Sequence, residues 1–275
     1  MRRPWSHRFA ILLAACTLLL SVTGAFVTSN EERPFYSFGQ AHFTVAGIAG
    51  ILAAGLVIWL WLEKTKAWLR ALGWIVLATG GVEVALGMQA DSQSRAVGAS
   101  HAFLAELLFL TTVVIALLTS SGWNRDPRPA GNQGRPSLSS LATVTLGLMV
   151  LQVALGVAVR HGLMGLAWHV FGAFLVVLST LILAVLVARR LPEDPALRPA
   201  ANTAATITSV QAFLGFTILS MQASRLIDPA AMIVATAVHT VVGALALAAG
   251  TVMTLLIRRN LRATKDAKKH AETAH

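Results

Sequence analysis

Eight long apolar stretches constrain the fold of this chain more than any other feature of its sequence. Each is about as long as a helix must be to cross roughly 30 Å of hydrocarbon. The stretches cover roughly residues 9–28, 39–62, 71–89, 98–119, 139–159, 163–188, 204–222 and 230–257. The sequence therefore predicts an all-α polytopic membrane protein with eight transmembrane helices.

The composition excludes two other classes of protein. With 56% hydrophobic and only 12% charged residues, the chain has too little polar surface for a soluble domain of 275 residues. A transmembrane barrel is excluded because its strands alternate polar and apolar residues, whereas the apolar stretches here are continuous. Contact with membrane lipid is therefore expected along most of the chain.

A two-helix unit recurs four times, with a glycine near the end of one helix and a histidine near the start of the next. It is clearest in Gln152–Leu175, where Gln152-x-x-Leu-Gly156 is followed by His169. The four units contain the pairs Gly24 and His42, Gly87 and His101, Gly156 and His169, and Gly215 and His239. Internal repeats of this kind define an architecture. This one predicts two pseudo-repeated four-helix bundles, residues 1–122 and 139–257, joined by a linker (123–138) and followed by a basic tail (258–275).

The first apolar stretch has two interpretations. Leu13-Ala14-Ala15-Cys16 resembles a lipoprotein cleavage box, so a cleaved leader is one alternative. Residues 17–27 stay apolar after the cysteine, however, and this favours an uncleaved first helix. Cys16 is the only cysteine, so the chain forms no intramolecular disulfide.

Lys and Arg residues are distributed unevenly over the two sides of the predicted membrane. Most of the 22 fall before the first helix, after the second, fourth and sixth helices, and in the C-terminal tail. The opposite side has only Arg33, Arg95, Arg160 and Arg225. Because Lys and Arg accumulate on the cytoplasmic side, we expect both termini in the cytoplasm of a bacterial-type inner membrane. This distribution also explains the net charge of +10, and we expect no nucleic-acid partner.

Four of the eight histidines lie inside apolar stretches, one in each even-numbered helix. These are His42, His101, His169 and His239. At roughly 1.5 Å per residue they lie about 5–14 Å from the outer ends of their helices. His161 lies at the outer end of the fifth helix. The remaining three, His7, His270 and His275, lie in terminal segments, where we expect solvated side chains.

The matched depth of these four histidines indicates ligands, because ionisable side chains inside a membrane are costly and usually functional. Diagonal helices of a bundle lie about 13–14 Å apart when adjacent helices are 8–10 Å apart. That gap accommodates a flat macrocycle with one imidazole on each side, as in bis-histidine haem. No Cys, Asp or Glu cluster has the spacing of a zinc site. Haem iron is therefore the predicted metal at His42, His101, His169 and His239.

Other residues near the outer ends of the helices fit a haem site as well. The four repeat glycines lack Cβ and would let a flat ring approach the backbone, although close packing between helices is the alternative. Arg160 directly follows the fifth helix. Because Arg pairs well with carboxylates, we predict that Arg160 contacts a haem propionate. The alternative is that its side chain extends to the polar surface of the membrane.

Several motifs, taken in their order along the chain, resemble those of the haem A synthase family of cytochrome oxidase assembly proteins. His7-Arg8-Phe9-Ala10 with Gly24–Ser29 resembles that family's first helix. Gln152–Gly156 through Val159-Arg160-His161 resembles its fifth helix, and Gln211–Gly215 with Ala237–Ala244 resembles its seventh and eighth. The resemblance covers nearly the whole chain.

The resemblance implies two haem sites and an oxidoreductase activity. His42 and His101 would bind the substrate haem O, and His169 and His239 would hold a permanent haem b. The implied reaction oxidises a porphyrin methyl group to a formyl group, which gives haem A. The implied partners are a haem O-supplying enzyme and cytochrome oxidase assembly factors.

The chain departs from the family pattern in its N-terminal half. The family has Glu-x-x-His-Arg around its first histidine, whereas this chain has Gly39-Gln40-Ala41-His42-Phe43. The first outer loop is also shorter than in the family. Two alternatives to the enzyme therefore stay open: a non-catalytic haem-binding assembly or carrier protein, and a b-type electron-transfer cytochrome. A transporter is disfavoured because the helices are unbroken and lack charge pairs at mid-depth.

Two carboxylates lie within the apolar stretches, Glu83 and Glu106. Glu106 lies about 140° around its helix from His101 and therefore on a different face. Glu83 precedes Gly87 by one turn, at the position that Gln152 takes in the third repeat. We predict that Glu83 is catalytic, replacing the missing glutamate as a proton carrier; a neutral, hydrogen-bonded Glu83 is the alternative.

Overall fold

The computed structural model describes residues 5–29, 36–89, 94–124, 134–224 and 228–273, which form eight α-helices and no strand. These are α1 (Trp5–Ser29), α2 (Tyr36–Leu62), α3 (Ala67–Gly87), α4 (Arg95–Thr119), α5 (Leu138–Arg160), α6 (Leu166–Arg190), α7 (Leu197–Ser224) and α8 (Pro229–Thr273). Each is long and apolar enough to span a membrane, which confirms the predicted class. Arg33, Arg225 and residues 125–133 of the predicted linker lie outside the described residues.

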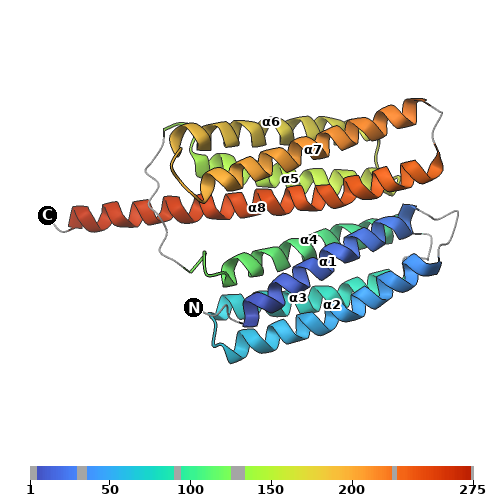
Figure 1. Cartoon of the computed structure of the whole chain (residues 1–275), viewed down its shortest axis with the longest axis horizontal. Helices are drawn as coiled ribbons and strands as arrows, with labels where there is room; N and C mark the ends of the chain where they lie inside the picture. Colours follow the sequence, from blue (N-terminus) through green and yellow to red (C-terminus); the bar gives the residue numbers. More distant parts are fainter. Residues whose placement is uncertain (1–4, 30–35, 90–93, 125–133, 225–227, 274–275) are drawn as a thin grey trace.

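The helices form two four-helix bundles that lie side by side (Figure 1). In the first bundle, α1 and α3 each pack against both α2 and α4, so that α2 and α4 lie on a diagonal. In the second, α5 and α7 each pack against both α6 and α8, so that α6 and α8 lie on a diagonal. The two bundles therefore have equivalent arrangements, which confirms the predicted pseudo-repeat.

The helices alternate in direction, so that α1 begins and α8 ends at the same end of the molecule (Figure 1). We call this the inner end and the opposite one the outer end. Each bundle has an apolar core toward the inner end. Among its fully buried residues are Leu56, Leu60 and Ile115 in the first bundle, and Leu183, Leu197 and Ile257 in the second. The outer half of each bundle is left for the polar side chains described below.

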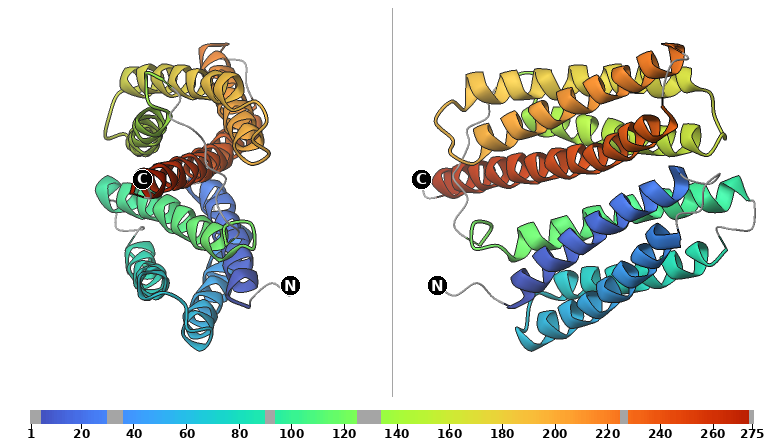
Figure 2. Two further views of the ribbon diagram at one scale, coloured as in Figure 1. Left: turned by 90° about the vertical axis from the view of Figure 1, so that its left-hand side faces the viewer. Right: turned by 45° about the vertical axis from the view of Figure 1, so that its right-hand side comes forward.

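The two bundles contact each other mainly through α8, which packs against α1 and α4 (Figure 2). We call this contact surface the interbundle interface. Its middle is apolar, with Phe109 of α4 packed against Ala244 and Ala248 of α8. Toward the inner end, the guanidinium of Arg259 lies 5.0 Å from the ring centre of Trp123. A cation over an indole ring is a favourable contact that helps to hold α8 beside the end of α4.

The exterior of both bundles is apolar. Large side chains point outward along the helices, including Phe43, Ile51, Trp168, Phe174 and Phe213, each more than half exposed. A soluble protein rarely exposes such an extended apolar surface. Lipid tails cover these side chains in a membrane, which accounts for the unbroken apolar stretches of the sequence.

Serine and glycine residues begin and end several helices. The hydroxyl of Ser94 accepts a hydrogen bond from the backbone N–H of Val97 at the start of α4, and Ser137 does the same at the start of α5. Such caps satisfy N–H groups that have no partner within the helix. After α5 the chain turns through Gly162, whose φ of +64° is the left-handed conformation that glycine adopts without strain.

Two helix boundaries differ from those predicted. Helix α7 begins at Leu197 rather than near residue 204, because Leu197 and Ala201 are buried in the core of the second bundle. Helix α8 continues to Thr273, so most of the predicted tail (258–275) is helical. Its many charged residues end the apolar stretch without ending the helix, since Lys and Arg are good helix formers.

The prediction of a solvated His7 is wrong. Its side chain is buried, with Nδ1 3.0 Å from the carbonyl oxygen of Ala116 and 3.3 Å from Oγ1 of Thr119. Helix α1 begins at Trp5, four residues before the apolar stretch, and this places His7 against the inner end of α4. The backbone N–H of Ser6 donates a hydrogen bond of 3.1 Å to the carboxylate of Glu63, the residue after α2.

Candidate functional site

The four histidines of the even-numbered helices meet in two pairs, one in each bundle. The ring centres of His42 and His101 are 6.3 Å apart, with an angle of 77° between the ring planes. Those of His169 and His239 are also 6.3 Å apart, with an angle of 78°. The two bundles thus hold their histidine pairs in the same geometry, near the outer end and across the diagonal.

This spacing is the one expected for two imidazoles on opposite sides of a single metal ion. An imidazole nitrogen lies about 1.15 Å from its ring centre and binds a metal ion at about 2.0–2.1 Å, which puts axial ring centres roughly 6.3–6.5 Å apart. The large interplanar angle is compatible with axial ligation, because each ring can rotate about the metal–nitrogen bond. Among the described residues, no group of three or more His, Cys, Asp or Glu residues could hold a bare metal ion. A haem iron needs only two protein ligands.

Each repeat glycine lies against the histidine of the following helix. An added Cβ would come within 3.2 Å of Cε1 of His42 at Gly24, 3.4 Å of His101 at Gly87, 2.9 Å of His169 at Gly156 and 3.1 Å of His239 at Gly215. The close approach in the structure is therefore between a helix backbone and an imidazole ring. The glycines make room for the histidines and so fix where each ring can lie.

In the first bundle both histidines contact an oxygen atom through Nδ1. Nδ1 of His42 lies 2.9 Å from Oγ1 of Thr23, and that hydroxyl also donates to the backbone carbonyl of Leu19. Nδ1 of His101 lies 2.8 Å from Oε2 of Glu83. An oxygen that accepts the Nδ1 proton leaves Nε2 of the same ring free to bind a metal, an arrangement common among metal-ligating histidines. Glu83 thus lies beside the histidine of the next helix.

In the second bundle glutamines take the place of Glu83. Nε2 of Gln152 lies 3.0 Å from Nδ1 of His169, and Nε2 of Gln211 lies 3.2 Å from Nε2 of His239. The buried Oε1 atoms of both glutamines have no hydrogen-bond partner among the described residues. Rotation of either amide would present its oxygen to an imidazole N–H. The first bundle therefore fits a haem that would be held through Nε2 of both histidines. In the second bundle the contacts of the glutamines leave Nε2 of His169 and Nδ1 of His239 for a haem iron.

Two further glycines on even-numbered helices accommodate these glutamines. A Cβ at Gly172 would clash with Oε1 of Gln152, and one at Gly243 would lie 3.0 Å from Nε2 of Gln211. In the second bundle, α5 and α6 are thus joined by two contacts, and so are α7 and α8. In each pair of helices, a glycine of the first helix lies against the histidine of the second, and a glutamine of the first lies against a glycine of the second. Sequence reasoning missed Thr23 and these two glycines. The signal for the glycines was their position three or four residues after His169 and His239.

Arg160 connects the two bundles near both histidine pairs. Its Nη1 donates to Oγ1 of Thr240, the residue after His239, at 2.8 Å. Its Nη2 donates to the carbonyl oxygen of Ala25, the residue after Gly24, also at 2.8 Å. The predicted propionate partner of the second bundle thus also contacts the first bundle, which sequence reasoning did not foresee.

The turn after α5 makes additional contacts with the first bundle. Nη1 of Arg95, at the start of α4, donates to the carbonyl oxygen of Gly162 at 3.4 Å. The ring of His161 lies against Gly98, where an added Cβ would come within 3.0 Å of it. These contacts and Arg160 hold the outer ends of the two bundles together.

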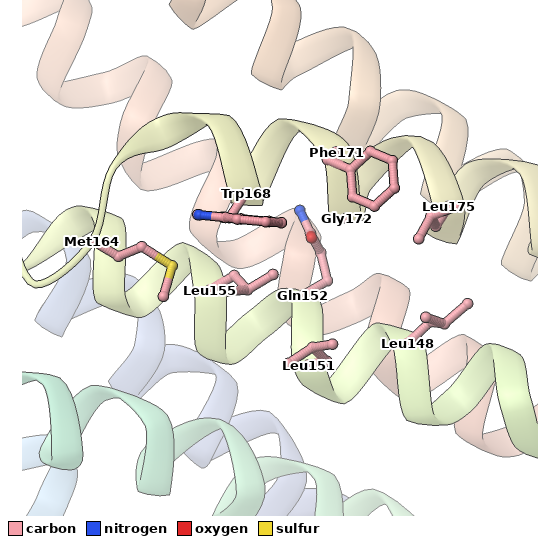
Figure 3. Close-up of a pocket in the computed structure, with 9 residues that line it drawn as sticks. All are labelled: Leu148, Leu151, Gln152, Leu155, Met164, Trp168, Phe171, Gly172 and Leu175. Atoms are coloured by element: carbon pink, nitrogen blue, oxygen red, sulfur yellow. The ribbon is translucent and has the colours of Figure 1, made fainter.

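A pocket of about 390 Å³ lies between α5 and α6 beside the second histidine pair (Figure 3). Its lining is apolar apart from Gln152, whose side chain points between the two helices toward Gly172 (Figure 3). Trp168 and Phe171 flank it on the side that faces lipid. Gln152 therefore separates this pocket from His169.

The fold and the site define a multi-pass helical membrane protein with one histidine pair in each of two equivalent bundles. No family model and no curated protein sequence matches the chain in a comparison with known proteins. Any assignment of function therefore depends on the geometry of the two histidine pairs and on the order of the sequence motifs.

Proposed function

We propose that the protein is a haem-binding membrane oxidoreductase of haem A synthase type, which converts haem O to haem A for the assembly of cytochrome oxidase. His169 and His239 hold a permanent haem b, and His42 and His101 bind the substrate haem. The observation that carries the proposal is the equal separation of 6.3 Å within both histidine pairs. The family-like order of motifs supplies the reaction: oxidation of a porphyrin methyl group to a formyl group. The distribution of Lys and Arg supports cytoplasmic termini in a bacterial-type inner membrane.

The side chains around the first pair have distinct roles in this proposal. Thr23 and Glu83 contact Nδ1 of His42 and His101, which would leave Nε2 of each ring to hold the haem iron. Glu83 also supplies a carboxylate beside the substrate that can accept or return a proton. Arg160 offers a cation to a propionate group near the outer end. His169 and His239 would hold haem b, which would pass to an external acceptor the electrons that oxidation of the methyl group releases.

The second candidate function is that of a haem carrier or assembly protein without catalytic activity. The observation in its favour is Gly39, which stands where the family has the glutamate of Glu-x-x-His-Arg. In this case both histidine pairs bind haem, but the chain carries out no oxidation. A haem O-supplying enzyme and cytochrome oxidase assembly factors are partners in either case.

Haem extraction from the purified protein, with and without a supply of haem O, tests the proposal. We expect haem b in both preparations and haem A only after haem O has been supplied. Haem O that is retained unchanged would establish the carrier function instead. A protein that contains only haem b in both bundles would be a b-type cytochrome, and one without haem would overturn the proposal.

Replacement of the ligands locates each haem. We expect His169→Ala and His239→Ala to lose the low-spin absorption of haem b, because a single imidazole leaves one axial position without its ligand. His42→Ala and His101→Ala should retain that absorption and lose binding of added haem O. A full wild-type spectrum in either His169→Ala or His239→Ala would contradict the assignment of that ligand.

A further inference from the structure

Glu106 is a buried acid that the proposed reaction does not use. It lies on α4, its exposed fraction is only 6%, and its Oε2 has no hydrogen-bond partner among the described residues. The side chain of Ser21 on α1 lies beside the carboxyl group. A carboxyl inside a membrane is costly and is retained mainly where it has a function.

The repeat itself does not require a carboxyl at this position. The equivalent residues, five positions after the histidine, are Gly47 in α2, Phe174 in α6 and Ala244 in α8. Phe174 points to lipid, with 63% of its surface exposed, whereas Glu106 is buried. One turn further along α4, Phe109 packs against Ala244. Glu106 therefore lies on α4 between His101 and the residue that packs against the second bundle.

Three buried side chains with hydroxyl groups lie on the neighbouring turns: Ser21 and Thr17 on α1, and Thr112 on α4. Ser21 donates to the backbone carbonyl oxygen of Thr17 at 3.5 Å, and Oγ1 of Thr17 lies 3.2 Å from Oγ1 of Thr112. A hydroxyl group beside a carboxyl group can either donate to it or accept from it.

No cation neutralises Glu106 among the described residues. Helix α4 packs against α1, α3, α5 and α8. Besides Arg95 and His101 on α4 itself, the titratable side chains on or next to the outer and central parts of these helices are Cys16, Glu83, Arg160, His161, Asp228 and His239. No ion pair joins any of them to Glu106 in the part of the chain that the structure describes. An ionised carboxylate without a cation is unstable in this environment, whereas a protonated one can donate or accept a hydrogen bond.

We propose that Glu106 is a proton-binding site on α4, beside the interbundle interface, where a buried carboxyl group without a neighbouring cation binds and releases a proton. When the charge at either histidine pair changes, a neutral acid nearby can release or bind a proton and so compensate the change. The proton-binding site itself is independent of the proposed function. Only its coupling to electron transfer depends on that function.

Infrared spectroscopy of the haem-free protein in lipid nanodiscs tests the proton-binding site. We expect a carbonyl band of a protonated carboxyl group at neutral pH, which shifts after transfer to deuterated water. Glu106→Gln should remove this band, and Glu83→Gln, the matched control, should retain it. Ser21→Ala should move the band to higher frequency, because one hydrogen bond is lost. A wild-type spectrum without such a band, or a band that survives Glu106→Gln, would overturn the proposal.

Reduced-minus-oxidised infrared spectra of the haem-loaded protein test the coupling. We expect a carboxyl signal that is absent in Glu106→Gln. If the haem-free band is present but does not respond to reduction, the site binds a proton statically and the coupling is wrong. If the protein takes up no haem, the proposed function and the coupling fail together, while the haem-free band still decides whether Glu106 holds a proton.

Discussion

A single missing Cβ determines how closely each imidazole approaches the neighbouring helix. At Gly156 the room is smallest, since an added Cβ would lie 2.9 Å from Cε1 of His169. Real Cβ atoms do not approach a ring this closely, so either the imidazole or the helix must move. The same α5 helix contains Gly147, where an added Cβ meets no atom within 4 Å. The two glycines therefore form a matched pair for testing this contact.

We expect Gly156→Ala to weaken haem binding in the second bundle. Overpacking of this kind costs about 1–3 kcal/mol, and the displaced ring of His169 no longer aligns with His239. Gly147→Ala should leave haem content unchanged and slightly stabilise the helix, because Ala has the higher helix propensity. Haem content and low-spin absorption of the two purified variants measure the difference. Equal haem content in both would show that the glycine contact does not position the ligand.

Gln152 positions His169 from the other side of the ring. Its Nε2 also donates to the backbone carbonyl of His169 at 2.9 Å, so that one amide holds both the ring and the helix. Loss of such an outer-shell partner typically weakens metal binding by about 10- to 100-fold. We expect Gln152→Leu to reduce haem affinity by this amount, as measured by haem titration. Gln152→Glu should retain more of the affinity than Gln152→Leu, because a carboxylate can still accept the Nδ1 proton although it loses the bond to the backbone carbonyl.

At the scale of the helix, the second repeat differs from the third and fourth by one functional group. Glu83 stands where α5 has Gln152 and α7 has Gln211, and all three side chains contact the histidine of the next helix. An amide can orient an imidazole but cannot carry a proton at neutral pH. The first bundle is therefore equipped for proton transfer at this position, and the second is equipped only to hold its ligand.

We expect Glu83→Gln to abolish conversion of haem O while leaving haem content unchanged. The substitution copies the second bundle, so the first histidine pair should still bind its haem. Chromatography of haems extracted after a supply of haem O measures conversion and content together. If conversion occurs in the wild type and survives in Glu83→Gln, the proton passes elsewhere. If the wild type converts no haem O, the carrier function replaces the enzymatic one.

The number and class of the helices could be predicted because each apolar stretch matches the thickness of a membrane. The residues at which the helices begin and end could not be predicted, since these depend on which side chains are buried and not on hydrophobicity alone. Leu197 extends α7 inward because it is fully buried, and His7 is buried because α1 begins earlier than the apolar stretch. Spacing along the chain likewise indicated the four histidines as ligands. It could not show that Arg160 reaches Ala25, since that contact depends on how the bundles pack.

At the scale of the whole molecule, the two bundles approach each other most specifically at the outer end. Arg160 is hydrogen-bonded to Thr240 beside the second histidine pair and to Ala25 beside the first. Its contact with Thr240 places the guanidinium beside the residue that follows His239. The guanidinium of Arg160 thus contacts residues beside both histidine pairs, and it helps to set the distance between the two pairs. Electron transfer between two centres depends steeply on that distance.

We expect Arg160→Gln to lower the midpoint potential of both haem sites, because loss of a cation stabilises the more positive, oxidised state. A unit charge at about 10 Å with an effective dielectric constant of about 20 contributes about 1.7 kcal/mol, or roughly 70 mV for one electron. Arg160→Lys keeps the charge, so its potentials should stay near those of the wild type. Redox titration of the haem-loaded protein, followed at the absorption of each haem, measures both sites at once.

Arg95→Gln is the matched control, since Arg95 contacts the same turn at Gly162 but through a longer hydrogen bond of 3.4 Å. We expect it to shift either potential by less than half as much as Arg160→Gln does. A shift in Arg160→Gln that is confined to the second bundle would mean that the contact with Ala25 is structural only. Equal shifts in Arg95→Gln and Arg160→Gln would mean that the charge acts from the membrane interface rather than from between the two bundles.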